Sequence, residues 1–248
     1  YNERGFEIYS YWKWLFMEKK VFRRKVYDEL LEWKNNRSKK YALLIRGARR
    51  VGKSTIVEEF ANKEFRSYIL IDFAHTSTAI KTLFDDMSDL DFFFLQLQQL
   101  TGKRLYKGES VIIFDEVQLF PQARQAIKYL VADGRYRYME TGSLLSIRKN
   151  TKDILIPSEE HKIDMYPMDF EEFLWATGDE ITADTIRYLM KNKKAAGNTL
   201  HRNLMRKFRL YMLVGGMPQA IETYLEDNNL QVVDETKREI IDLYEEDF

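Results

Sequence analysis

The chain has 248 residues, and its 39 lysines and arginines balance 39 aspartates and glutamates, so its formal net charge is zero. This length suits one large α/β domain, alone or with a smaller appendage, and neutrality leaves only local patches to attract nucleic acid or an anionic membrane. The chain has no cysteine, so disulfides, thiolate metal sites and cysteine nucleophiles are excluded.

The chain begins with an unusual aromatic segment. Residues 1–16 hold seven aromatic side chains and lack the apolar core of a signal peptide. We expect an added or misassigned leader before Met17, a segment that packs on the core, or an interaction arm. Elsewhere the longest apolar stretches, at 41–45 and 111–114, fall far short of the ~20 residues that a membrane span requires. We therefore expect a cytoplasmic protein without a membrane partner.

Strand and helix patterns then alternate along the chain. In order, the expected elements are a helix at 22–34, a strand at 41–46, a helix at 55–63, a strand at 67–73, a helix at 82–100, a strand at 111–114, a helix at 122–132 and strands at 136–141 and 163–165. This alternation predicts a three-layer α/β fold, a parallel sheet with helices on both faces. From residue 169 the pattern is helical, at 170–176, 183–191, 200–213, 219–225 and 232–244. We expect a core at 17–175 and an all-α lid at 176–248.

A glycine-punctuated loop follows the first strand. Its sequence GARRVGKST, residues 47–55, fits the phosphate-binding (Walker A) pattern G-x-x-x-x-G-K-[ST] in full. Gly47 and Gly52 are expected to take positive φ and let the backbone approach phosphates closely. The main-chain N–H groups that we expect to converge on those phosphates belong to Arg50, Val51, Gly52, Lys53, Ser54 and Thr55.

The end of this loop predicts a site for ATP with Mg²⁺. Lys53 is expected to contact the β- and γ-phosphate oxygens, and the Ser54 hydroxyl is expected to bind Mg²⁺. The side chains of Arg49 and Arg50 are open to two interpretations. They face solvent, or they contact phosphate or a neighbouring subunit.

Two acids end the strand at 111–114. Asp115 is expected to hold the Mg²⁺ shell, because this cation prefers carboxylate and water oxygens. Glu116 is expected to act as the general base that orients and polarises the attacking water. A strand that ends in two acids is a weak signal by itself. With a phosphate-binding loop upstream, the same pattern predicts the metal-binding (Walker B) strand of one shared site.

The acid that follows Asp115 also predicts topology. It is typical of P-loop proteins that insert a strand between the loop strand and the metal-binding strand, and the strand at 136–141 is the candidate. The expected order is therefore 5-1-4-3-2. Thr141 or Ser143, at the end of this strand, is a candidate sensor of the γ-phosphate or the attacking water. For Ser143 a simple helix N-cap is the alternative.

Two other kinds of site are disfavoured. A GTPase requires an N-K-x-D base-reading motif, and the nearest candidate, at 151–153, has its acid one residue too early. The three histidines, His75, His161 and His201, are scattered, which disfavours a zinc site or a histidine-based triad.

Taken together, the motifs resemble a known group, the uncharacterised prokaryotic AAA-type ATPases with a C-terminal domain of unknown function. The similarity covers about residues 20–248 and depends on LLEWK, LLIRGARRVGKS, IIFDEVQ, TGSLL, YPMDFEEFL and YMLVGGMPQAI, in that order. It implies an ATPase core followed by a helical lid. It also implies a further C-terminal domain, similar to nuclease-like folds, that is missing here, and hence a possible link to DNA.

The resemblance further suggests roles in the lid. In the GGMP turn, Pro218 is a candidate contact for adenine, with a helix-capping turn as the alternative. Arg206 and Arg209 are the candidates for a lid sensor, although no arginine matches a definite one. The segments 19–25 and 202–209 are locally basic, which solvated helix faces explain.

Three functions are carried forward. The first is an ATP-hydrolysing switch or motor. The second is a nucleotide-gated interaction module that hydrolyses little ATP and presents its lid to a protein partner, and the third is an ATPase that DNA stimulates. A small-molecule kinase has no visible acceptor site.

Overall fold

The computed structural model describes residues 20–143 and 157–245. The aromatic leader at 1–16 and the triplet at 151–153 lie outside the described residues. In chain order the elements are α2 (Val26–Asn36), β1 (Ala42–Gly47), α3 (Lys53–Glu64), β2 (Ser67–Asp72), α4 (Thr78–Thr82), the 3-10 helix η1 (Leu83–Asp85), α5 (Leu90–Thr101), β3 (Ser110–Asp115), the 3-10 helix η2 (Val117–Leu119), α6 (Pro121–Asp133), β4 (Arg137–Ser143), β5 (Glu160–Met165), α8 (Phe170–Ala176), α9 (Thr182–Lys191), α10 (Gly197–Val214), α11 (Pro218–Asp227) and α12 (Leu230–Glu245).

The five strands form one parallel sheet in the order β2-β3-β4-β1-β5. The strand β4 pairs with β1 on one side and β3 on the other, so it is inserted between the loop strand and the strand that carries the acid pair. This order confirms the predicted P-loop NTPase fold. Because parallel strands end at the same edge, Gly47 lies in register with Ser143, and Asp72 with Asp115.

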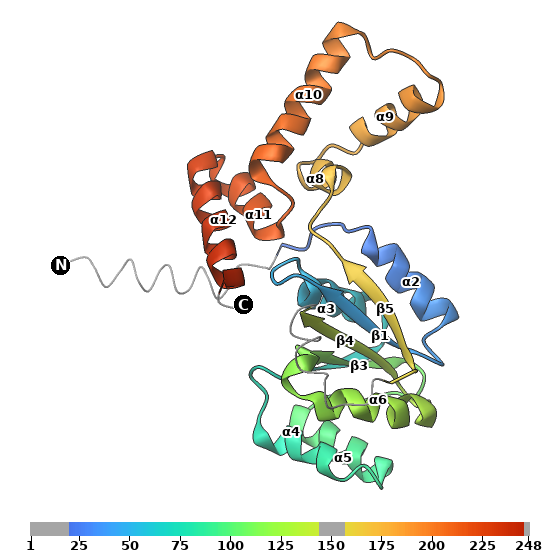
Figure 1. Cartoon of the computed structure of the whole chain (residues 1–248). Coiled ribbons are helices and arrows are strands. Elements are labelled where there is room, and N and C mark those ends of the chain that lie inside the picture. The colour runs from blue at the N-terminus through green and yellow to red at the C-terminus, as the bar shows by residue number, and fades with distance from the viewer. Residues whose placement is uncertain (1–19, 144–156, 246–248) are drawn as a thin grey trace, which may run out of the picture.

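Alternating side chains of the strands build two cores, one on each face of the sheet (Figure 1). On β1, Leu43 and Ile45 pack with α2 and α3, whereas Leu44 points to the opposite face. That second face is covered by α4, α5 and α6 and is rich in phenylalanine. Full burial of each such side chain contributes about 1.5–3 kcal/mol, so the layered core fixes the strand ends that carry the functional groups.

The helix predicted over 82–100 is wrong in extent. The segment holds the end of α4, then η1, and finally α5 from Leu90. Between them Asp86 accepts hydrogen bonds from the main-chain N–H and the hydroxyl of Ser88, at 2.9 and 2.6 Å. Asp89 then caps α5 by accepting from Phe92 N at 3.0 Å. These local side-chain bonds compete with the helix, and they break it where aspartate and serine cluster.

The segment from α8 to α12 is entirely helical, as the sequence predicts. A third core joins α8, α10, α11 and α12, and Phe22 from the segment before α2 also packs into it. Gly216 connects this region to the chain after β5, because its carbonyl accepts from Met168 N at 2.7 Å. A Cβ on Gly216 would lie 2.2 Å from Met168 O, so only glycine fits. No helix among the described residues is long and apolar enough to cross a membrane.

Candidate nucleotide-binding site

The loop between β1 and α3 has the backbone of an anion-binding site. Arg50 and Gly52, at alternate positions, both take positive φ, 61° and 94°. Such alternation turns successive main-chain N–H groups towards one side. Gly52 is the N-cap of α3 and offers no side chain to cap it, so the first N–H groups of the helix and its positive dipole end are available to an anion.

Gly47 is required for a reason that differs from the prediction. Its φ is not in the positive range. Instead, a Cβ at this position would lie 2.2 Å from Met165 O, on the neighbouring strand β5. The glycine therefore allows the two strand ends to approach closely just before the loop begins.

Lys53 is held against its own loop. Its Nζ donates to Gly47 O at 3.2 Å and to Ala48 O at 2.8 Å, and the residue is 5% exposed. Burial lowers the pKa of Lys53, the charges of Glu116 and Asp115 oppose this shift, and Arg49 adds to it. The ammonium group is thus fixed at the centre of the loop, within the field of two carboxylates.

Asp115 brings three of the predicted residues together. Ser54 Oγ donates to Asp115 Oδ1 at 2.8 Å, and Thr141 Oγ1 donates to the same oxygen. Thr141 in turn accepts from Glu116 N at 3.2 Å. Asp115 is 7% exposed, so this cluster of hydroxyl and carboxylate oxygens is partly shielded from water. It joins α3, β3 and β4 at the carboxyl edge of the sheet.

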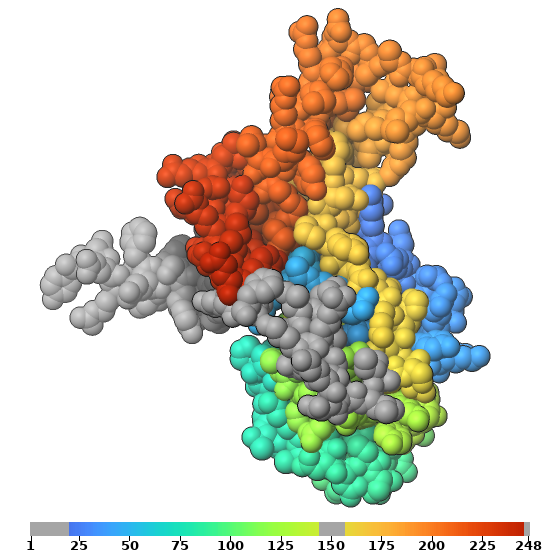
Figure 2. All heavy atoms as spheres, viewed as in Figure 1, coloured from blue at the N-terminus to red at the C-terminus, as the bar shows by residue number. Residues whose placement is uncertain are grey.

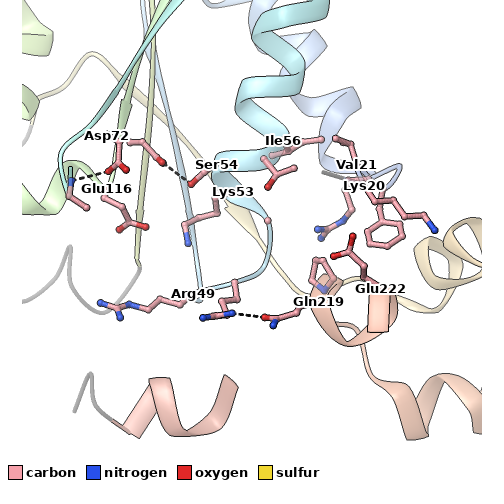
Figure 3. A pocket seen from close by; sticks show the side chains of 18 of the residues that line it. Lys20, Val21, Arg49, Lys53, Ser54, Ile56, Asp72, Glu116, Gln219 and Glu222 are labelled. Atoms are coloured by element: carbon pink, nitrogen blue, oxygen red, sulfur yellow. Dashed lines mark hydrogen bonds between the residues drawn. The ribbon is translucent and has the colours of Figure 1, made fainter. Parts of the chain in front are cut away.

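Glu116 has a constrained backbone. Its φ is 54°, a left-handed value that is uncommon for residues other than glycine. Its side chain accepts from Gln118 Nε2, and Figure 3 shows it turned towards the same cavity as Lys53. Neither sensor candidate lines the cavity: Thr141 is fully buried and Ser143 is 3% exposed. Thr141 reaches the site only through its contacts with Asp115 and Glu116 N.

A cavity of about 640 Å³ opens beside these groups (Figure 3). It is lined by the loop, the ends of β2 and β3, α11 and the segment before α2, with the predicted residues Arg49, Arg50, Gly52, Lys53, Ser54, Thr55, Asp115, Glu116 and Pro218 among its walls. Val51 is fully buried beneath the loop. Arg206 and Arg209 lie on α10 and do not line the cavity. The structure therefore gathers most of the predicted residues of the loop and of the acid pair around one space. The predicted residues that do not line it are Gly47, Val51, Thr141, Ser143 and the two lid arginines.

The helical segment closes directly over the loop. Pro218 Cγ lies 3.7 Å from the position of a Cβ on Gly52. Arg50 Nη1 donates to Gln219 Oε1 at 2.6 Å, so its side chain contacts α11 rather than only solvent. Tyr244 on α12 donates to Arg49 O at 2.7 Å. The loop and the helices thus share a contact surface.

Sequence reasoning missed several residues of the cavity. Arg24 donates to Val51 O at 2.8 Å and to Tyr166 O at 2.6 Å, and pairs with Glu172 at 3.2 Å. No local pattern could have identified it, because its partners lie far along the chain. Asp72 ends β2 as Asp115 ends β3, and that shared strand-end position was an available signal. The other missed lining residues are Lys20, Val21, Phe22, Ile56, Ala74, His75, Gln118, Leu119, Gln219 and Glu222.

The sheet order and the loop between β1 and α3 define the fold of the P-loop nucleoside triphosphatases. The family model described as the AAA domain matches residues 39–174, more than half of the chain, and the chain belongs to that family. A solved structure of PCH-2 from C. elegans aligns with a TM-score of 0.42 and 12% identity, over 86% of this chain and 65% of that one. Hsp104 in its closed state, with ATPγS and FITC casein, aligns with a TM-score of 0.43 and 14% identity, over 64% and 30%. No curated protein sequence matches the chain.

Proposed function

We propose that the chain binds ATP with Mg²⁺ in this cavity and hydrolyses it slowly, as a nucleotide-driven switch or motor. One observation carries the proposal. The carboxyl edge of the sheet combines an anion-binding turn, a buried ammonium group and a hydroxyl–carboxylate cluster within one cavity. These are the three chemical elements that a triphosphate and its metal require.

The residues present fit Mg²⁺. Ser54 and Asp115 offer a hydroxyl and a carboxylate whose oxygens already lie 2.8 Å apart, and hard cations of this kind prefer such oxygen ligands. We assign these two residues to the metal. When bound, Mg²⁺ would neutralise charge on the phosphate oxygens. Lys53 and the N–H groups of the loop supply the remaining positive charge.

The far side of the cavity fits a nucleobase. Val21, Phe22 and Ile56 line it together with Pro218, which packs near Gly52, and the charged Lys20, Arg24 and Glu222 border these apolar side chains. An apolar wall next to a phosphate-binding turn is the arrangement that a purine nucleotide requires, because its base is flat and its phosphates are charged. We propose that Pro218 contacts adenine.

Glu116 is the proposed general base. Its carboxylate faces the cavity and acts electrostatically on Lys53. Thr141 contacts Asp115 and accepts from the main chain of Glu116, which supports it as the sensor in preference to Ser143. The Gln118 side chain holds Glu116, and we propose that it positions this base.

The contacts between the loop and α11 support a switch. A bound phosphate would attract the Arg50 side chain into the cavity. This movement would break the hydrogen bond that Arg50 donates to Gln219 on α11. If two arrangements of the helices bind the nucleotide with different affinities, nucleotide binding shifts the equilibrium towards the arrangement with the higher affinity. We therefore propose that the helical segment at 176–248 acts as a lid on the core at 17–175.

The test is phosphate release from ATP by the full chain and by Glu116→Gln. We expect kcat to fall by roughly 10²–10⁴, the usual contribution of a general base, with little change in ATP affinity. Glu109→Gln is the control, because Glu109 is an exposed carboxylate that pairs with Arg66 at 2.9 Å. Parent-like turnover by Glu116→Gln would contradict the catalytic role. Retained ADP with negligible turnover by the parent would favour the interaction module instead.

A further inference from the structure

Charge is strongly segregated along this neutral chain. Between Asp184 and Glu222 there is no acidic residue, and eight basic ones occur: Arg187, Lys191, Lys193, Lys194, Arg202, Arg206, Lys207 and Arg209. Because the chain is neutral as a whole, the remainder carries a matching acidic excess. The basic segment therefore has a local field of its own, which the overall net charge conceals.

This basic segment lies on the surface of the fold, and most of its side chains are exposed. The segment forms most of α9 and all of α10, which we call the basic arm (residues 185–214). Figure 1 shows α9 and the far end of α10 extending away from the sheet, and Figure 2 shows the same pair projecting at the top of the molecule, with α8 against its base. Of the 18 residues of α10, only Val214 is buried. Leu210 and Tyr211, near its end, pack against the third core, and the rest of the helix leaves a wide exposed face for a partner.

Three arginines form a stripe on this helix. Arg202, Arg206 and Arg209 are spaced by four and three residues, which places them on one helical face. All three are exposed, and none has an ion pair within the described residues. The exposed Lys191, Lys193 and Lys194 also have no ion pair within the described residues, whereas two other basic side chains of the arm do. Arg187 pairs with Asp184 at 2.9 Å and also with Glu171, and Lys207 pairs with Asp179.

The chemistry of the exposed face indicates the class of partner. Between 198 and 209 the exposed side chains are Asn198, Thr199, His201, Arg202, Asn203, Arg206, Phe208 and Arg209. A protein interface has an apolar centre depleted in charge, and a membrane-bound helix exposes an apolar face. Among the exposed side chains of this stretch Phe208 alone is apolar, and it packs on Phe170 and Tyr211. The other exposed apolar side chains of the arm lie outside the stretch, Tyr188 and Met190 on α9 and Met212 and Leu213 in the last turn of α10. The face consists mainly of hydrogen-bond donors and positive charge.

We propose that the basic arm binds nucleic acid through its phosphate backbone, with Arg202, Arg206 and Arg209 as the main contacts. A guanidinium group presents a planar fork of donors that matches phosphate oxygens. Contacts of this kind give affinity without reading sequence, so the binding is expected to be independent of base sequence. The inference goes beyond the proposed ATPase and does not depend on it.

The test is the fluorescence anisotropy of labelled single-stranded and duplex DNA, titrated with the full chain without nucleotide at several salt concentrations. The variant is Arg202→Gln/Arg206→Gln/Arg209→Gln. The control, Arg37→Gln/Lys39→Gln/Lys40→Gln, removes equal charge from an exposed turn after α2. For the parent we expect binding that weakens steeply with salt. In the arm variant the slope of log K against log salt should be smaller by about 2–3, since each phosphate contact contributes about 0.9. Affinity at low salt should fall at least tenfold, while the control stays close to the parent.

Three results would overturn the proposal. They are no DNA binding at low salt, an equal loss in the control, and arm-dependent binding to polyglutamate or anionic vesicles without binding to DNA. A charge-retaining variant, Arg202→Lys/Arg206→Lys/Arg209→Lys, should keep most of the affinity, which separates lost charge from a lost fold. Because no nucleotide is present, failure here leaves the proposed ATP hydrolysis untouched.

Discussion

Ser54 Oγ donates a 2.8 Å hydrogen bond to Asp115 Oδ1, although 61 positions separate the two residues. The first residue lies in the opening turn of α3 and the second ends β3, so the bond joins the phosphate-binding loop to the adjacent acid pair. The same carboxylate oxygen accepts from Thr141 on β4. One buried acid thus holds the side chains that we assign to metal binding and sensing, and its removal should affect the metal before it affects the triphosphate.

Asp115→Asn should abolish the contribution of Mg²⁺ to ATP affinity. An amide oxygen is a poorer ligand for this cation than a carboxylate, so affinity with Mg²⁺ should approach the value measured with a chelator. Calorimetric titrations with and without Mg²⁺ measure this difference. Asp91→Asn is the control, because Asp91 is an exposed aspartate on α5 that pairs with Arg135 and does not line the cavity. The metal assignment would be wrong if Asp115→Asn kept the full effect of Mg²⁺.

Pro218→Ala should weaken ATP binding by roughly three- to tenfold, since about 1 kcal/mol of apolar contact with the base would be lost. Binding of inorganic tripolyphosphate, which has no base, should not change. Pro121→Ala is the control, because both prolines open a helix, and it should leave both ligands unaffected. Equal weakening of ATP and tripolyphosphate would indicate that Pro218 acts only through the loop.

Glu140 makes the stability of the fold depend on pH. It is fully buried in β4, and neither carboxylate oxygen has a hydrogen-bond partner within the described residues. Burial raises the pKa of Glu140 well above 4.5, and the charge of Glu160 raises it further, whereas Arg124 and Lys162 oppose the shift. The folded protein therefore keeps a proton that the unfolded chain releases, and its stability falls as pH rises from about 4.5 towards the folded pKa.

Glu140→Gln should remove this dependence, because glutamine is a neutral residue of similar shape. The free energy of unfolding of the variant should therefore increase relative to that of the parent as pH rises from about 5 to about 8, so the variant becomes the relatively more stable protein. Urea unfolding at these two pH values measures it, with the exposed Glu109→Gln as control. A difference that stays constant with pH would show that Glu140 is already ionised in the folded protein.

Much of the architecture could be predicted because local patterns encode it. The position of Glu116 directly after Asp115 predicted an inserted strand, and the sheet order confirms that prediction. The prediction of one helix over 82–100 was wrong because it followed the apolar periodicity of the segment and neglected the turn-forming residues around Asp86 and Asp89. Side-chain hydrogen bonds of these aspartates decide the break, and they act over only two or three residues.

The rest of the site depends on contacts between distant segments. Arg24 joins the loop, the chain after β5 and α8, and nothing near it in sequence reveals these partners. The same holds for the bond from Arg50 to Gln219, which only the packing of α11 creates. Motifs therefore locate the phosphate end of the cavity, whereas the fold alone reveals the walls contributed by the helices and by the segment before α2.

The most direct measurement is the affinity of Lys53→Ala for ATP at physiological Mg²⁺. Lys53 Nζ is fixed at 2.8 Å from Ala48 O in the centre of the loop, so its loss should weaken ATP binding at least tenfold, about 1.4 kcal/mol. Lys63→Ala, an exposed lysine on the same helix that pairs with Glu59 at 2.5 Å, should bind ATP like the parent. ATP binding by Lys53→Ala equal to that of the parent would contradict the account.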